Sequence, residues 1–144
     1  MVSRVRRTIQ QKLILEAVRS LHNHPTMDQV YEEVRSRYPE IGKATVYRNL
    51  SQLSEEGQIR SLALPSSPMR YDDTVFPHNH FRCRQCGEIL DVDADLEKAL
   101  EGKVKAPRGV LIEAVNVSFI GLCHHCNAVT TEKQAQMLQQ SLSA

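Results

Sequence analysis

The 144-residue chain has no long apolar run and almost no net charge. Its apolar stretches are far shorter than the ~20 residues needed to cross a bilayer, so we expect no transmembrane helix. The N-terminal segment MVSRVRRTIQQ lacks the apolar stretch of a secretory signal. Internal repeats and low-complexity tracts are also absent. With 24% charged and 41% hydrophobic residues, the composition is that of a globular protein, and we expect it to be cytoplasmic.

The net charge of +1 is unevenly distributed along the chain. Residues 1–62 contain ten lysines and arginines against seven acidic residues, whereas residues 63–144 contain eight against ten. A mildly basic first half and an acidic second half suggest two parts with different partners. The charge alone is too small to indicate nucleic-acid binding.

The first half has the pattern of three helices followed by a β-hairpin. Apolar residues recur at helical spacing over residues 9–21, where Thr8 is the expected N-cap. Thr26 and Gln29 predict a capping box for the second helix, and Gly57 is expected to end the third, KATVYRNLSQLSEEG. The segments QIRSLAL and MRYDD can pair across the turn-forming PSSP. This order predicts a winged helix-turn-helix domain, whose third helix enters the major groove of DNA.

The outward face of the expected third helix carries side chains suited to DNA. Apolar groups can contact thymine methyls, and polar groups can donate hydrogen bonds to bases and phosphates. A solvated helix on a three-helix core also has a polar face, so this pattern leaves both interpretations open. The candidate contacts are Thr45, Tyr47, Arg48, Asn49, Ser51 and Gln52.

The four cysteines of the chain form two C-x-x-C pairs, Cys83 with Cys86 and Cys123 with Cys126. Two such pairs predict one tetrahedral zinc ion, and a closed four-thiolate site is structural rather than catalytic. Disulfides are disfavoured in a cytoplasmic protein. A redox-active pair would open a helix after a strand, and it would leave the second pair unexplained.

The second half reads as a small β-rich unit. Strands are expected in GEILDV and GVLIEAVNVSFIGLC, and helices in DLEKALEG and TTEKQAQMLQQSL. A unit of this size is small for a self-sufficient core, so we expect zinc and dimerisation through the longer strand to stabilise it. The predicted fold class is therefore α+β, with a winged-helix domain followed by an α/β dimerisation domain that holds a structural zinc.

Further potential ligands remain once the cysteines are assigned to zinc. His78 and His80 alternate as on a strand and should point to the same side. Asp91 follows them, and Asp72 precedes them at the end of the expected hairpin. Such nitrogen and oxygen ligands suit Fe²⁺, Mn²⁺ or a non-structural Zn²⁺. An H-x-H pair at a domain junction is equally compatible with a polar linker.

Five segments occur in order along nearly the whole chain: HPTMDQVYEEV, ATVYRNLSQLSEEGQIR, RYD, HNHFRCRQCGEILD and GLCHHC. In these segments the chain resembles the ferric uptake regulator family of metal-dependent repressors. The resemblance implies a homodimer that binds palindromic operator DNA. It implies a DNA-binding domain at 1–73, a hinge at 74–79 and a dimerisation and metal-binding domain at 80–144. The ligands that it implies for a regulatory Fe²⁺ or Mn²⁺ are His24, Asp72, His78, His80 and Asp91.

Asp91 indicates which branch of the family the chain resembles. Peroxide-sensing repressors of the family have Asp at this place, whereas iron and zinc sensors more often have Glu. By the same resemblance, three imidazoles and two carboxylates would leave one open position on six-coordinate Fe²⁺. Peroxide could bind there and oxidise His24 or His78, which would release the metal and the repressor.

Two other functions remain open at this point. One is an iron- or zinc-responsive uptake repressor that uses metal only as a corepressor. The other is a zinc-ribbon enzyme, although the sequence contains no P-loop, no H-E-x-x-H and no nucleophile motif. The His/Asp set also spans a hinge, whereas a catalytic site needs ligands on rigid elements. We therefore expect a regulator rather than an enzyme.

Overall fold

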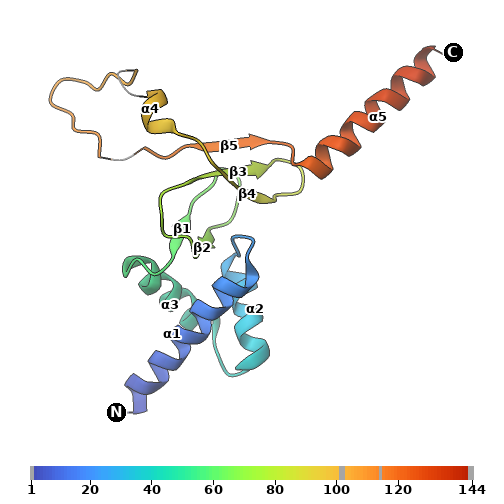
Figure 1. Cartoon of the computed structure of the whole chain (residues 1–144). Coiled ribbons are helices and arrows are strands. Elements are labelled where there is room, and N and C mark those ends of the chain that lie inside the picture. The colour runs from blue at the N-terminus through green and yellow to red at the C-terminus, as the bar shows by residue number, and fades with distance from the viewer. Residues whose placement is uncertain (1, 101–102, 114, 143–144) are drawn as a thin grey trace. The chain divides into compact units, whose positions relative to one another are not determined.

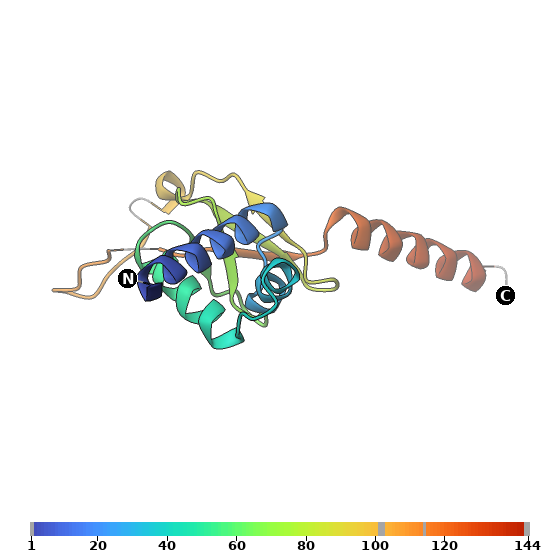
Figure 2. The same cartoon turned by 90° about the horizontal axis from the view of Figure 1, so that it is seen from below.

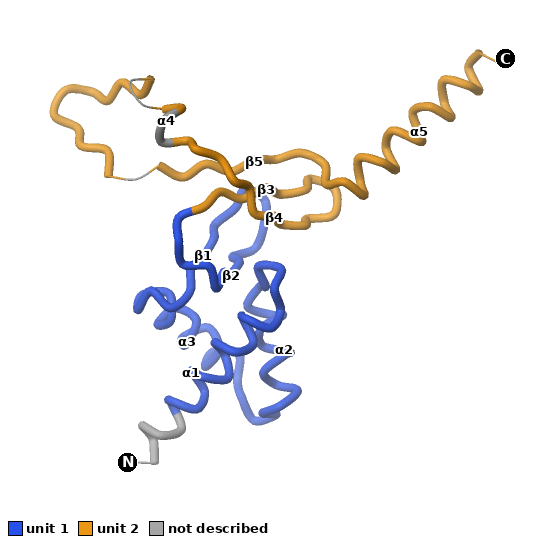
Figure 3. The backbone as a smooth tube through the Cα atoms, in the orientation of Figure 1, with its two compact units in different colours: residues 1–77 blue, residues 78–144 orange. Residues whose placement is uncertain are grey.

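The computed structural model describes residues 2–100, 103–113 and 115–142 (Figure 1). The chain forms two compact units, unit 1 (Met1–Pro77) and unit 2 (His78–Ala144) (Figure 3). The boundary between them falls inside the segment 74–79 that was expected to be a hinge. Within the described ranges, no helix combines the length and the apolar character that a membrane span requires.

Unit 1 consists of a three-helix bundle and a short antiparallel hairpin. The two strands pair with Arg60 opposite Asp72 and Leu62 opposite Arg70. This is the predicted order of a winged helix-turn-helix domain, although each strand has only three residues. The elements are α1 (Val2–Leu21), α2 (Met27–Arg37), α3 (Lys43–Glu55), β1 (Arg60–Leu62) and β2 (Arg70–Asp72).

Local sequence signals set the ends of α2 and α3. The backbone N–H of Gln29 donates to Thr26 Oγ1 at 3.2 Å, and Gln29 Oε1 accepts from the Thr26 N–H at 2.9 Å. This confirms the capping box. After α3, Gly57 has φ +70° and donates to the Ser54 carbonyl. The next N–H donates to the Leu53 carbonyl at 2.9 Å, which completes a Schellman motif.

The expected N-cap of α1 is wrong. The helix begins at Val2, so Thr8 lies inside it rather than at its start. Residues 2–7 contribute little to the apolar pattern that marked the helix, but arginine is a good helix former and no glycine or proline interrupts the segment.

The core of unit 1 lies where the inner faces of the three helices meet the hairpin. Ile14, Val30, Val46 and Leu50 are fully buried, and Tyr71 from β2 packs against the same cluster. Burial of each large apolar side chain contributes about 1.5–3 kcal/mol. This packing fixes α3 by one face and leaves part of the opposite face in solvent.

Unit 2 contains a three-stranded sheet and two helices. The strand order is β4-β3-β5, with β3 antiparallel to β4 and parallel to β5. The cysteine thiols lie at one end of this sheet, and Phe81 and Leu122 pack partly buried against them. The elements are β3 (Asn79–Cys83), β4 (Ile89–Val92), α4 (Leu96–Leu100), β5 (Ser118–Gly121) and α5 (His124–Leu142).

The long strand expected over residues 109–123 is wrong for most of its length. Among its described residues, only Ser118–Gly121 forms a strand. Val110 and Leu111 are 53% and 81% exposed, and they have no neighbouring strand in the described part of the chain. A strand needs a partner for its backbone hydrogen bonds, and an apolar sequence alone does not supply one.

The helical predictions in the second half need smaller corrections. The helix expected in DLEKALEG is α4, Leu96–Leu100, and the last two residues of that segment, Glu101 and Gly102, lie outside the described residues. The last helix was expected over residues 130–142, but it begins at His124. The second C-x-x-C pair therefore leads into α5.

Candidate metal centres and DNA-binding helix

The four cysteines come together within unit 2. Each offers an Sγ atom within 4.8 Å of the other three, and the Cys86 and Cys123 sulfurs are 3.7 Å apart. A tetrahedral site with Zn–S distances of about 2.3 Å requires sulfurs roughly 3.8 Å apart. None of the cysteines is in a disulfide. The donor set therefore fits one structural zinc ion.

Two turns place the thiols of each pair on the same side. Gly87 donates its N–H to the Cys83 carbonyl at 3.0 Å and has φ +78°, a conformation in which a side chain would cause strain. Asn127 donates to the Cys123 carbonyl at 2.9 Å, in the first turn of α5. The first turn thus requires glycine, while the second is helical.

The local environments of the thiols shift their pKa values in opposite directions, so the thiols differ in how readily they lose the proton that zinc binding displaces. Hydrogen bonds from the backbone N–H groups of Cys86 and Cys123 lower the pKa of Cys83 to about 6. Burial raises the pKa of Cys126 to about 12. Because zinc binds thiolates, Cys126 must lose its proton when the metal binds. Zinc binding should therefore strengthen as the pH rises.

The position of the second pair also bears on the redox alternative. Cys123 follows β5 and Cys126 lies in the first turn of α5, which is the arrangement that a redox-active pair would need. However, the thiols of both pairs lie in one cluster. A redox pair does not account for that convergence, whereas a zinc ion does.

His24 and Asp72 face each other within unit 1. Their Nε2 and Oδ2 atoms are 3.6 Å apart, and both side chains are buried. His24 has φ +48° and precedes proline, which is a strained conformation for a non-glycine residue. Arg70 donates to the His24 carbonyl, and Tyr71 donates to the Pro25 carbonyl, so β2 holds the loop in place. Strain that the surrounding structure maintains is often found at functional sites.

His78, His80 and Asp91 come together within unit 2. His80 and Asp91 are opposite one another on β3 and β4, and His78 immediately precedes β3. Asp91 Oδ1 is 3.2 Å from His78 Nε2 and 3.6 Å from His80 Nε2. The centroids of the two imidazole rings are 4.3 Å apart. The prediction that the histidines point to the same side is confirmed. Two imidazole nitrogens and a carboxylate oxygen form a donor set that suits a divalent cation.

The solvent-exposed part of α3 contains Tyr47 and Arg48. Tyr47 is 59% exposed, and Arg48 is also exposed. Gln52, one turn after Arg48, is half-buried and accepts a hydrogen bond from Arg7 Nη2 at 2.7 Å. The extended start of α1 thus brings a guanidinium beside α3, which the sequence analysis missed. Thr45 and Ser51 are half-buried.

The outward position expected for Asn49 is wrong. Its side chain is only 4% exposed, and its amide donates to the Thr45 carbonyl at 2.7 Å. Asn49 lies three residues after Val46 and four before Leu53, so it belongs to the inner stripe of the helix. The carbonyl contact satisfies its polar group there.

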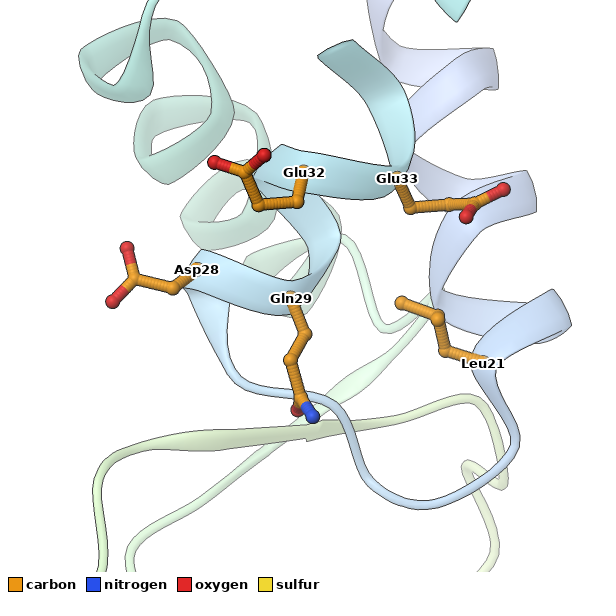
Figure 4. Close-up of a pocket in the computed structure, with 5 residues that line it drawn as sticks. All are labelled: Leu21, Asp28, Gln29, Glu32 and Glu33. Atoms are coloured by element: carbon orange, nitrogen blue, oxygen red, sulfur yellow. The ribbon is translucent and has the colours of Figure 1, made fainter. Parts of the chain in front are cut away.

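A surface pocket between α1 and α2 is acidic but is not a further candidate site (Figure 4). Two of its carboxylates pair with exposed neighbouring cations, Asp28 with Lys43 and Glu33 with Arg37. The pocket includes none of the expected ligands. It is lined by Leu21, Asp28, Gln29, Glu32 and Glu33.

Residues 3–120 match the model of the "Ferric uptake regulator family". The chain belongs to this family. The peroxide-responsive repressor PerR of Staphylococcus aureus is 30% identical over 122 residues, which cover 85% of this chain and 82% of that protein. The Campylobacter jejuni peroxide stress regulator is 29% identical, with a TM-score of 0.68 over 85% of this chain and 92% of that one. The Helicobacter pylori regulator Fur shares the fold, with a TM-score of 0.69 at 19% identity over 88% and 91%.

Family membership decides between the broad classes of function. The protein is a metal-dependent transcriptional repressor and not an enzyme, so the zinc-ribbon enzyme is excluded. Repressors of this family bind DNA and function as dimers. Solved members of the fold include a zinc-bound manganese uptake regulator and a Francisella tularensis regulator with iron. In this chain the four thiolates suit zinc, and the nitrogen and oxygen ligands of the His/Asp groups suit Fe²⁺ or Mn²⁺.

Proposed function

We propose that the protein is a peroxide-responsive repressor that binds operator DNA while its regulatory metal is bound. The observation that carries the proposal is the convergence of His78 and His80 on the same oxygen of Asp91. An aspartate at this place is the feature by which the chain resembles the peroxide-sensing branch. The names of the Staphylococcus aureus and Campylobacter jejuni relatives support the same branch.

One Fe²⁺ or Mn²⁺ ion is proposed to take its ligands from both units. Unit 1 would supply His24 and Asp72, and unit 2 would supply His78, His80 and Asp91. Within unit 1, His24 Nε2 is 3.6 Å from Asp72 Oδ2. Within unit 2, the Nε2 atoms of His78 and His80 lie 3.2 and 3.6 Å from Asp91 Oδ1. An ion that binds both groups favours the DNA-competent arrangement only if it binds that arrangement more tightly than the others. This difference in metal affinity would restrict motion at the hinge, residues 74–79.

The response to peroxide requires a redox-active metal and a nearby imidazole. Bound Fe²⁺ would activate peroxide, so that one peroxide oxygen adds to the imidazole, which supplies the two electrons, and the other leaves as water, whereas Mn²⁺ would serve as a corepressor without this chemistry. The contribution of the chain is to hold His24 and His78 as ligands, so that one of them takes up oxygen. An oxidised imidazole is a poorer ligand, so the affinity that links the two units falls and the repressor leaves its operator.

DNA recognition is assigned to α3 of each protomer in a homodimer. Two copies related by two-fold symmetry would read the half-sites of a palindromic operator. Tyr47 and Arg48 are the proposed principal contacts because they are the most accessible, and Thr45, Ser51 and Gln52 flank them. Asn49 is not among the proposed contacts, because its side chain is buried. A repressor of chromosomal operators acts in the cytoplasm, where we place the protein.

Mass spectrometry of the peroxide-treated protein tests the branch. Trypsin releases residues 71–82, which contain His78 and His80 but neither methionine nor cysteine. Residues 20–35 contain His24 together with Met27, and fragment ions separate the two. The Fe²⁺-loaded protein should gain one oxygen atom on His24 or His78, and the Mn²⁺-loaded protein should not. Oxygen found only on methionine or cysteine would instead support an iron- or zinc-responsive uptake repressor.

A further inference from the structure

Helix α5 lies beyond residues 3–120, which match the family model. Its first turns meet the rest of unit 2 through buried Cys126 and half-buried Val129 and Thr130. Every residue from 131 to 142 is exposed. Figures 1 and 2 both show the helix extending away from the β3-β5 strands of the same unit.

One face of α5 repeats at alternating intervals of three and four residues, the spacing of a coiled-coil seam. At 3.6 residues per turn, this face lies roughly opposite the side that carries Cys126, Val129 and Thr130. The fold of unit 2 therefore leaves it uncovered, with Leu138 64% and Leu142 86% exposed. We call this face the α5 seam; it consists of Ala128, Thr131, Ala135, Leu138 and Leu142.

The exposed part of α5 is too short to be stable on its own. Isolated helices shorter than about 12–15 residues are marginal in water, and most helices in proteins are stabilised by packing of an amphipathic face. Residues 131–142 fall at this limit and have no such packing within the described part of unit 2. A partner that covers the α5 seam would supply it.

We propose that the α5 seam packs against the α5 seam of a second copy of this chain, as a short parallel coiled coil that strengthens the dimer. The residues beside the seam suit this partner, because a parallel pair would place Gln134 opposite Gln139 and Asn127 opposite Glu132. No two like charges then face each other. The single lysine of α5, Lys133, gives no basic face for a nucleic acid or an anionic membrane.

The seam is narrow, and it acts as an addition to a dimer rather than as its sole support. Two leucines and two alanines would not hold two separate chains together. Repressors of this family are already dimers, so the second helix is present at high effective concentration. Under that condition a weak contact between two helices is sufficient to order both of them.

Paired substitutions on opposite faces of α5 test the proposal in the zinc-loaded full-length protein. Leu138→Gln with Leu142→Gln should weaken the dimer at least about tenfold, equivalent to about 1.4 kcal/mol. Met137→Gln removes a similarly exposed apolar side chain, 70% exposed, from the face opposite the seam, and should change the dissociation constant less than about twofold. Sedimentation of dye-labelled protein over a range of concentrations measures both constants, and metal analysis shows that zinc is retained.

A gain of stability provides the complementary test. Ala135→Leu should fill the seam and tighten the dimer, whereas Gln136→Leu, one position outside it, should not. An unchanged dimer in the double leucine variant would overturn the proposal. The proposal would also be overturned if Met137→Gln weakened the dimer as much as the double leucine variant does. The same holds if Ala135→Leu and Gln136→Leu tightened the dimer equally, because the effect would then not depend on the seam.

Discussion

Replacement of Cys86 by serine would remove one zinc ligand with little change in packing. Cys86 is the exposed member of the four and lies in the turn between β3 and β4. Serine differs from cysteine by one atom, so no cavity forms in the core. Structure lost in this variant can therefore be attributed to the metal rather than to the side chain.

The expected effect is large because the core of unit 2 is built around the zinc ligands. Phe81 and Leu122 are only partly buried there, and even full burial would contribute about 1.5–3 kcal/mol each. Structural zinc contributes an apparent binding free energy of about 10–16 kcal/mol at neutral pH. Cys86→Ser should therefore release zinc and unfold β3 to β5. Unit 1 has its own apolar core and should remain folded.

Hydrogen exchange followed by mass spectrometry distinguishes the two units in one experiment. Peptides from β3, β4 and β5 should lose protection in Cys86→Ser, while peptides from α1 to α3 keep it. Gln85→Ser is the matched control, because Gln85 is an exposed neighbour that does not bind zinc. If the sheet of Cys86→Ser exchanged as slowly as that of the control, or if its zinc remained bound, the reasoning would be refuted.

Three further predictions concern DNA, the regulatory metal and pH. Tyr47→Ala or Arg48→Ala should cost about 1–3 kcal/mol and relax specificity at one base if a base contact is lost. Loss of a phosphate contact should instead weaken all sequences and flatten the salt dependence, which titrations at two salt concentrations reveal. His24→Ala should retain zinc and remain a dimer, but it should fail to bind operator with Mn²⁺ in a gel-shift assay. Asp91→Glu should still bind Mn²⁺, but its Fe²⁺-loaded form should be oxidised more slowly by peroxide. Because burial raises the pKa of Cys126 to about 12, zinc affinity measured by chelator competition should fall as the pH is lowered.

Features that depend on neighbouring residues could be predicted from the sequence. Thr26 and Gln29 form the capping box because the two residues are three apart, and Gly57 ends α3 because only the local backbone is involved. The cysteine site was predictable for a similar reason. The two cysteines of each C-x-x-C are close in sequence. Because the chain has only four cysteines, a four-thiolate site must combine the two pairs.

Features that depend on distant segments could not be predicted in this way. A single histidine before a proline has no pattern, and His24 reaches Asp72 only because Arg70 and Tyr71 hydrogen-bond to its loop. Its candidacy came from the resemblance alone. Asn49 could have been placed correctly from its spacing to the buried residues of α3, but its polar side chain suggested the outer face.

Operator binding before and after peroxide treatment distinguishes a peroxide sensor from a metal-uptake repressor. An operator would first be selected from random DNA with Mn²⁺-loaded protein, and both metal forms would then be titrated against it. Peroxide should release the Fe²⁺-loaded protein and leave the Mn²⁺-loaded protein bound. Retention of both forms would contradict peroxide sensing and favour a metal-uptake repressor. Equal release of both would show that the response does not depend on iron at the proposed site.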